Sequence, residues 1–178
     1  MAYQFSFSKL LNNFAAFQIA WFACAIWHDT RSVVVCVMLL MWLYHSEPWS
    51  KVRIYLTIQI AAIGIITDHL LSYFGVLQFE NIIGIIPFWL VLLWFLFAST
   101  ISVSLKWMME KPLLAAVGGF IFGPAAYWGG MQFDALFIEH WFNLLILGLC
   151  WSVLMLTFSF LYKRQPNNRL LMRESSWS

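Results

Sequence analysis

The sequence contains few charged residues, and this shortage limits the environments in which the chain can fold. Asp, Glu, Lys and Arg together make up 10% of the 178 residues, whereas 62% are hydrophobic. Soluble domains carry roughly 25% charged residues. Because so few polar side chains cannot cover a folded domain in water, the composition favours a lipid bilayer as the solvent. The 11 tryptophans agree with this, since indole rings favour the membrane–water interface.

Cysteine is also scarce, and its spacing argues against two kinds of structure. The three cysteines are odd in number, lie in apolar segments and have no CxxC spacing (Cys24, Cys36 and Cys150). The sequence therefore indicates neither a disulfide framework nor a zinc site, and we interpret all three as small core residues. A net charge of +2, without a basic patch interleaved with aromatic residues, gives no support for nucleic acid as a partner.

Long apolar runs account for most of the chain. A helix needs about 20 mostly apolar residues to cross a bilayer. Six candidate spans satisfy or approach this length, at about 10–28, 32–46, 52–75, 87–106, 113–131 and 137–162. We therefore predict an all-α fold in which residues 1–162 form one bundle of six transmembrane helices, and residues 163–178 form a polar, basic cytoplasmic tail.

The distribution of Lys and Arg predicts how this bundle is oriented. With the N-terminus inside, nine of the ten basic residues fall on the cytoplasmic side and only Arg31 falls outside. Such a bias is typical of the cytoplasmic side of multi-pass membrane proteins. We therefore expect six spans with both termini in the cytoplasm.

The third predicted span carries an aspartate and a histidine in the stretch "GIITDHLLSYFG" (Gly64 to Gly75). At about 100° per residue, Asp68 shares one narrow helix face with small or polar residues only (Thr57, Ala61, Gly64, Ser72 and Gly75). Small residues let helices approach closely in lipid, so this stripe is predicted to face the bundle. His69 lies a quarter-turn away, at the edge of the stripe.

The depth of Asp68 leaves two interpretations of its role open. Counted along the helix, Asp68 lies past the midpoint of the span, toward the outer leaflet. An ionised aspartate there costs about 2.5–3.5 kcal/mol on insertion scales, so it should be paired, protonated or open to a water-filled cavity. Asp68 either bridges helices or acts on a proton, substrate or metal.

Further polar residues collect at the same outer level. His28 and Asp29 end the first span, Asp134 follows the fifth, and Asn143 lies one turn inside the sixth, after Glu139 and His140. Histidines and carboxylates near one leaflet can form an acid–base or metal site. No HExxH or His-x-x-His spacing is present, so we predict no bound metal and no cofactor.

The fifth predicted span, "AAVGGFIFGPAAYWGG", combines small residues with aromatic ones. Ala115, Gly119, Ala126 and Gly130 form one small face, and Gly119-x-x-x-Gly123 adds close-approach spacing. Pro124 removes a backbone donor and predicts a kink. We expect either tight helix packing or a lipid-sized cavity shaped by Tyr127 and Trp128 beside that kink.

Four motifs carry a resemblance to a known family. They are "NFAAFQIAW" (Asn13 to Trp21), Asp68 with Leu70-Leu71 after it, "PFWLVLLWFLFAST" (Pro87 to Thr100) continuing to "SLKW", and "GPAAYWGG" (Gly123 to Gly130). Together, over nearly the whole chain, they resemble the bacterial inner-membrane domain-of-unknown-function family 2878. Genes of that family often lie beside a cyclopropane-fatty-acid synthase, which implies membrane-lipid modification or protection by association only. The family defines no catalytic residues to carry over.

The leading hypothesis is an inner-membrane protein that binds or helps to modify a lipid acyl chain from the outer half of the membrane, with membrane lipids as its partners. In this hypothesis Asp68 orients or protonates a polar group. The candidate catalytic residues are Asp68, His69 and His28, and the candidate substrate-binding residues are Gln18, Trp94, Tyr127, Trp128 and Asn143.

Two other classes of function remain open. The chain is alternatively a non-enzymatic subunit or scaffold for a lipid enzyme, with a membrane protein as its partner. A small proton-coupled transporter that uses Asp68 and His69 is a third reading, against which the lack of internal repeats counts. The residues do not decide whether the protein is an enzyme.

Overall fold

Helices form nearly all of the ordered structure, as the apolar runs predict. The computed structural model describes residues 7–46, 49–80 and 85–165. Within these ranges the helices are α1 (Phe7–Trp27), α2 (Thr30–Ser46), α3 (Lys51–Tyr73), α4 (Phe88–Ile101), α5 (Lys106–Met109), α6 (Pro112–Met131) and α7 (Phe142–Lys163). The all-α prediction is confirmed, and the one extended feature there is an isolated antiparallel bridge between Gln78 and Phe137. Most of the predicted tail, residues 166–178, lies outside the described residues.

Within the ranges described, four helices are long and apolar enough to cross a membrane, which indicates a membrane protein. These are α1, α3, α6 and α7, whereas α2 and α4 are shorter apolar helices of 17 and 14 residues. Each predicted span therefore corresponds to a helix, but two of the six do not reach the length of a transmembrane segment.

The fourth predicted span ends earlier than the hydrophobic pattern indicates, for a local reason. The hydroxyls of Ser99 and Thr100 donate to the carbonyls of Leu96 and Phe97 at 2.7 and 2.6 Å. Such bonds compete with the regular helical bonds and loosen the backbone. Helix α4 stops at Ile101, and a turn leads into the short helix α5.

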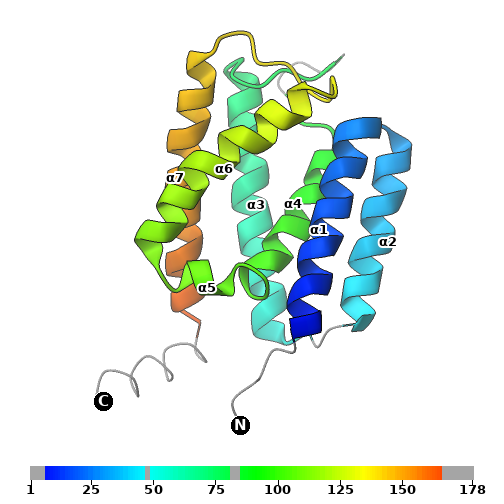
Figure 1. Ribbon diagram of the computed structural model, residues 1–178, viewed down its shortest axis with the longest axis vertical. Helices are drawn as coiled ribbons and strands as arrows, with labels where there is room; N and C mark the ends of the chain where they lie inside the picture. The colour runs from blue at the N-terminus through cyan, green and yellow to red at the C-terminus, as the bar shows by residue number, and fades with distance from the viewer. Residues whose placement is uncertain (1–6, 47–48, 81–84, 166–178) are drawn as a thin grey trace.

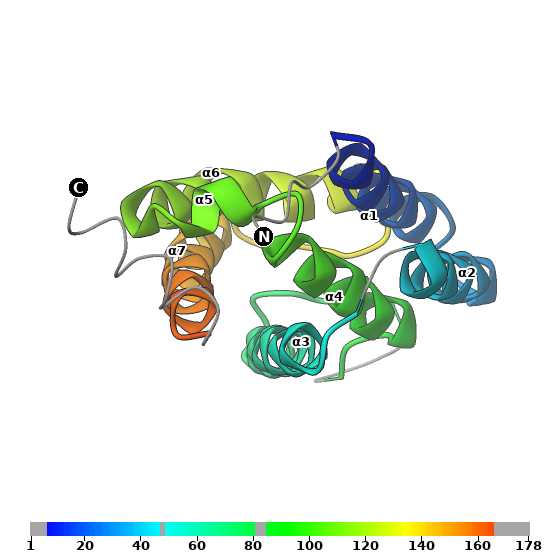
Figure 2. The same cartoon turned by 90° about the horizontal axis from the view of Figure 1, so that it is seen from below.

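The helices run between the same two ends of the bundle, with α1, α3 and α6 in one direction and α2, α4 and α7 in the other (Figure 1). Helix α4 lies in the middle and contacts α1, α2 and α3. Seen along the bundle, α1 and α2 lie on one side of α4, and α6 and α7 lie on the other (Figure 2). Helix α6 crosses one face of the bundle obliquely (Figure 1).

Basic residues collect at one end of this bundle. Among the described residues, Arg31 alone lies at the end where α1 finishes and α2 begins. The other Lys and Arg residues stand at or near the opposite helix ends (Lys9, Lys51, Arg53, Lys106, Lys111, Lys163 and Arg164). The uneven distribution of Lys and Arg along the sequence therefore places nearly all of the described basic residues at one end of the bundle.

Candidate functional site

The small-residue stripe of α3 faces the interior, as its spacing predicts. Thr57, Ala61, Gly64, Asp68 and Ser72 are all buried, and Asp68 has no exposed surface. The opposite face of α3 carries exposed apolar side chains such as Ile58 and Ile66. The prediction that Asp68 points into the bundle is confirmed.

Two aromatic side chains donate hydrogen bonds to Asp68. The indole N–H of Trp94, from α4, donates to Oδ2 at 2.7 Å. The hydroxyl of Tyr127, from α6, donates to Oδ1 at 2.6 Å. Asp68 thus joins three helices through one carboxyl group.

Glycines bring these groups into contact. A Cβ placed on Gly64 would lie 2.2 Å from Cε3 of Trp94, so the indole ring can lie across α3 only because that side chain is missing. Trp94 in turn stacks on Trp151 of α7, with ring centroids 5.2 Å apart and an interplanar angle of 15°.

Helix α6 approaches Trp151 in the same way. A Cβ on Gly119 would lie 2.4 Å from the Trp151 carbonyl oxygen, and one on Gly123 would lie 2.3 Å from Cγ of Trp151. The close approach predicted from Gly119-x-x-x-Gly123 is confirmed, with α7 as the partner helix. Pro124 lies within α6, whose helical residues continue past it to Met131.

In the part of the chain that the structure describes, the surroundings of Asp68 contain hydrogen-bond donors but no cation. Among the described residues, the ion pairs involve other carboxylates, such as Arg31 with Asp29 and His140 with Glu139. Both oxygens of Asp68 accept bonds from neutral donors, so the carboxyl group acts as an acceptor that positions Trp94 and Tyr127.

An apolar cavity of about 80 Å³ lies beside this group. Its walls come from α1, α4, α6, α7 and the segment between α6 and α7. The aromatic lining residues are Phe17, Trp21, Trp89, Trp94, Phe97, Tyr127 and Trp151. Asp68 itself is not a lining residue; Trp94 and Tyr127 stand between its carboxyl group and the cavity.

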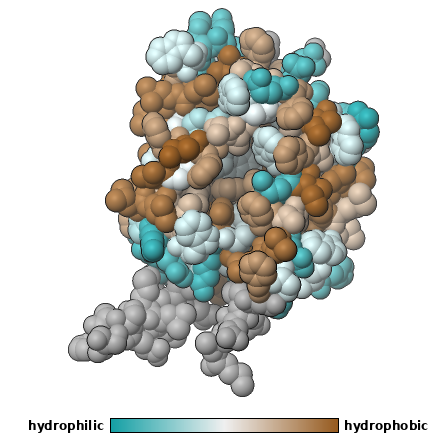
Figure 3. Space-filling model, viewed as in Figure 1, coloured by the Kyte–Doolittle hydropathy of each residue, from teal (hydrophilic) through white to brown (hydrophobic). Residues whose placement is uncertain are grey.

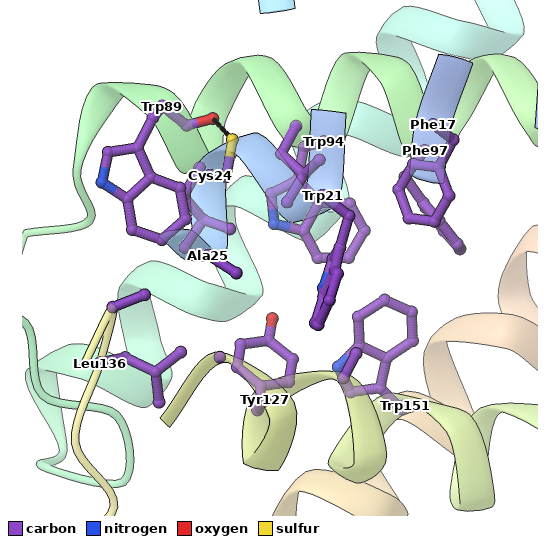
Figure 4. A pocket seen from close by; sticks show the side chains of 15 residues that line it. Phe17, Trp21, Cys24, Ala25, Trp89, Trp94, Phe97, Tyr127, Leu136 and Trp151 are labelled. Carbon is purple, nitrogen blue, oxygen red and sulfur yellow. Dashed lines mark hydrogen bonds between the residues drawn. The ribbon is translucent and has the colours of Figure 1, made fainter. Parts of the chain in front are cut away.

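The close view shows how these side chains enclose the space (Figure 4). Trp21 from α1, Trp94 from α4 and Trp151 from α7 all line the space, and the Tyr127 ring closes the side formed by α6. The Trp151 N–H is directed toward Tyr127 and is buried without a hydrogen-bond partner in the described part of the chain. On the surface, this face of the bundle is hollowed at its centre (Figure 3). Helices α1 and α6 flank the cavity on that face and touch where Trp21 packs over Gly129.

The structure brings together three of the predicted site residues and separates the others. Asp68, Trp94 and Tyr127 form the hydrogen-bonded group. His69 and Trp128 are exposed on the outside of α3 and α6, away from the cavity.

The remaining three predicted site residues occupy other places. His28 follows α1 in a left-handed conformation (φ 36°), with its Nδ1 3.4 Å from the Ala25 carbonyl oxygen. Gln18 lies on the outer face of α1, in a shallow apolar groove. Asn143 is buried and donates to the Val76 carbonyl at 3.5 Å, which ties α7 to the segment after α3.

The polar residues at this end of the bundle form small local pairs. Arg31 binds Asp29 through two side-chain hydrogen bonds, and its guanidinium holds the pKa of that exposed carboxyl below the usual range. Gln78 donates to Glu139 at 3.4 Å. No group of three or more His, Cys, Asp or Glu side chains gathers in metal-binding range within the ranges described.

Sequence reasoning missed several residues that build the site. Trp151 lies in an apolar run of α7 with no feature that distinguishes it from a lipid-facing tryptophan. Trp21 and Trp89 are equally inconspicuous, although both line the cavity. A second polar contact was also missed: buried Asn13 donates to Ser99 at 3.2 Å and accepts from Ser104 at 2.9 Å.

Comparison with known proteins identifies one family. The model of the family described as "Protein of unknown function (DUF2878)" matches residues 10–157. No curated protein and no solved structure matches the chain.

Proposed function

The chain belongs to the DUF2878 family, and from this premise we propose that it binds the acyl chain of a membrane lipid in the aromatic cavity beside Asp68. It does so as a six-helix protein of the bacterial inner membrane, with both termini in the cytoplasm. The observation that carries the proposal is an apolar cavity in the middle of a membrane bundle, flanked by two helices on a hollowed face of the molecule (Figure 3).

The size and lining of the cavity suit part of a hydrocarbon chain. Its volume of about 80 Å³ is smaller than the engineered apolar cavities of about 150 Å³ that bind benzene. It therefore accommodates a short segment of an acyl chain, while the rest of the lipid stays in the bilayer. Aromatic rings supply large contact areas for such a segment.

The position of the opening suits a ligand that arrives from the membrane. Helices α1 and α6 are both candidate spans, so the space between them faces hydrocarbon rather than water. An acyl chain can enter sideways without leaving the apolar phase.

Asp68 supports binding rather than chemistry in this proposal. Its two oxygens accept from Trp94 and Tyr127, so the carboxyl group holds two walls of the cavity in place. Because Asp68 does not line the cavity, it can position a ligand only through Trp94 and Tyr127.

A photoactivatable lipid tests the proposal. Purified protein is reconstituted with a phospholipid that carries a diazirine near the end of one acyl chain, irradiated, digested and mapped by mass spectrometry. We expect adducts on cavity-lining positions, such as Leu90 and Leu93 of α4, in addition to those on the outer surface.

Two neighbouring alanines provide a matched pair of variants. Ala126 lines the cavity, whereas Ala125 is exposed on the outside of the same helix. Ala126→Leu should remove the α4 adducts and leave the surface adducts unchanged, while Ala125→Leu should leave both. Equal α4 labelling in the two variants, or no α4 labelling in the wild type, would contradict acyl-chain binding in the cavity.

A further inference from the structure

Two cysteines that are separate in the sequence meet between α1 and α2. The Sγ atoms of Cys24 and Cys36 lie 3.5 Å apart, and both residues are free thiols. Cys24 also approaches the carbonyl oxygen of Trp89 at 3.9 Å (Figure 4), which holds its sulfur between α2 and α4. A disulfide needs an S–S separation of about 2.05 Å, so a movement of about 1.5 Å joins the two sulfurs.

The pair is shielded from protein oxidants and reductants. Cys24 is 1% exposed and Cys36 is 0% exposed, so a second protein's active-site thiol cannot reach either sulfur. Cys24, however, is also one of the residues that line the cavity, and Cys36 is not. A small or apolar molecule inside the cavity therefore meets Cys24 first.

We propose that Cys24 and Cys36 form a dithiol that reduces an apolar hydroperoxide, such as a peroxidised acyl chain, in the cavity. The inference rests on the proposed function only in taking the cavity as the route by which a hydrocarbon-soluble oxidant enters. The redox step itself depends on the two sulfurs.

The step balances with the hydroperoxide as the two-electron oxidant. The Cys24 sulfur attacks the terminal oxygen of R–O–O–H, the O–O bond breaks, and the Cys24 proton passes to the departing R–O oxygen to give R–OH. Cys24 is then a sulfenic acid. The Cys36 sulfur attacks the Cys24 sulfur, and the hydroxyl leaves with the Cys36 proton as water. Two thiols and one hydroperoxide become one disulfide, one alcohol and one water.

The third cysteine offers an internal control. Cys150 in α7 is partly exposed and pairs with neither of the other two sulfurs. If exposure alone governed oxidation, Cys150 would react before the buried pair. In the proposed reaction, Cys150 stays reduced while Cys24 and Cys36 are consumed together.

The test treats purified full-length protein in detergent micelles with cumene hydroperoxide and follows thiols, disulfide peptides and cumyl alcohol. We expect the wild type to lose two of its three thiols, to yield a Cys24–Cys36 linked peptide and to release one alcohol per disulfide. Cys150→Ser should behave in the same way. Cys36→Ser should stop at a Cys24 sulfenic acid that dimedone traps, and Cys24→Ser should keep Cys36 reduced.

Three results would overturn the inference. They are three intact thiols in the oxidised wild type, loss of Cys150 before the pair, and oxidation of Cys36 at the wild-type rate in Cys24→Ser. The lipid-labelling experiment separates this outcome from that of the proposed function. If α4 is labelled by the lipid but no disulfide forms, the redox reaction is ruled out and lipid binding stands. If a disulfide forms but α4 is not labelled, stable lipid binding is ruled out and the redox reaction stands.

Discussion

At the scale of single residues, the central feature is a buried carboxyl group that accepts hydrogen bonds from two neutral donors inside an apolar bundle. Burying a polar group in hydrocarbon costs free energy unless it is hydrogen-bonded, and this applies to the indole N–H and the phenol O–H as much as to the carboxyl. Asp68 accepts from Trp94 and Tyr127, so one acceptor satisfies two donors on buried side chains. The three side chains are therefore interdependent, and their arrangement fixes two walls of the cavity.

This interdependence predicts different effects for two substitutions of Asp68. In Asp68→Asn the amide oxygen still accepts from Trp94, and the amide N–H can donate to the Tyr127 oxygen once the hydroxyl turns. Asp68→Leu leaves the Trp94 N–H and the Tyr127 O–H without an acceptor, and each unsatisfied buried donor lowers the stability by roughly 1–3 kcal/mol. We expect the free energy of unfolding to fall by roughly 2–6 kcal/mol in Asp68→Leu and by clearly less in Asp68→Asn.

Unfolding by sodium dodecyl sulfate in mixed micelles measures this difference. Tyr127→Phe serves as the intermediate case, because it removes a single donor and leaves the Trp94 bond intact. Equal losses of stability in the Asn and Leu variants would show that the hydrogen bonds contribute nothing and that only the charge or the shape matters.

The residue scale also shows why sequence reasoning named Asp68, Trp94 and Tyr127 but did not show that they contact one another. The direction of Asp68 is a property of one helix, so the spacing of Ala61, Gly64 and Ser72 was sufficient to predict it. Its partners come from α4 and α6, and no spacing within α3 specifies which residues those helices present. Cys24 and Cys36 illustrate the same limit, because their contact depends on how the α1–α2 turn places the two helices.

At the scale of elements, glycines decide how closely the helices pack and hence where the aromatic rings lie. Helix α6 contacts α7 along Gly119 and Gly123, and α3 contacts α4 at Gly64. In lipid, helices associate through close packing rather than through the hydrophobic effect, so small residues at the contact carry much of the association. Each of these glycines has a tryptophan as its neighbour, and both tryptophans line the cavity.

Two adjacent glycines of α6 provide a test of this role. A Cβ at Gly119 meets the Trp151 backbone, which cannot move aside. One at Gly118 comes closest to the flexible Met108 side chain, with Sδ at 3.0 Å, and reaches Phe122 only at an ordinary van der Waals distance of 4.0 Å. Alanine favours helix over glycine by roughly 1 kcal/mol at either position. Overpacking typically costs 1–3 kcal/mol, so we expect Gly119→Ala to destabilise the protein and Gly118→Ala to be neutral or stabilising.

The same unfolding assay measures both variants, and the diazirine lipid reports the cavity. Displacement of α7 in Gly119→Ala should also change the pattern of α4 adducts, because Trp151 forms one wall. Equal stability of the two variants would contradict close α6–α7 packing as the reason for the glycine spacing.

At the scale of the whole molecule, the short central helix α4 shows how the bundle can sit in a membrane. Helix α4, with 14 residues, is about 21 Å long at 1.5 Å per residue, against a hydrocarbon core of about 30 Å. The long helices around it meet lipid, while α4 is enclosed by its neighbours (Figure 2). An enclosed helix need not match the bilayer, because protein rather than lipid satisfies the backbone beyond its ends. Hydropathy could therefore locate six apolar helices, but not which of them lipid surrounds.

The directions of the helices and the positions of the basic residues together predict the membrane topology of the protein. Helices alternate in direction between the two ends of the bundle, and α1 begins at the same end where α7 finishes (Figure 1). The basic residues stand at that end, and a positive charge bias marks the cytoplasmic side.

In a bacterial host, a green fluorescent protein fused after Arg164 should therefore fluoresce. Alkaline phosphatase, which is active only outside the inner membrane, should be active when fused after Gln78 or after Asp134, at the opposite end, and inactive after Lys111. Phosphatase activity after Arg164 would contradict a cytoplasmic C-terminus. Activity after Lys111 with none after Gln78 would mean that the entire bundle is inverted.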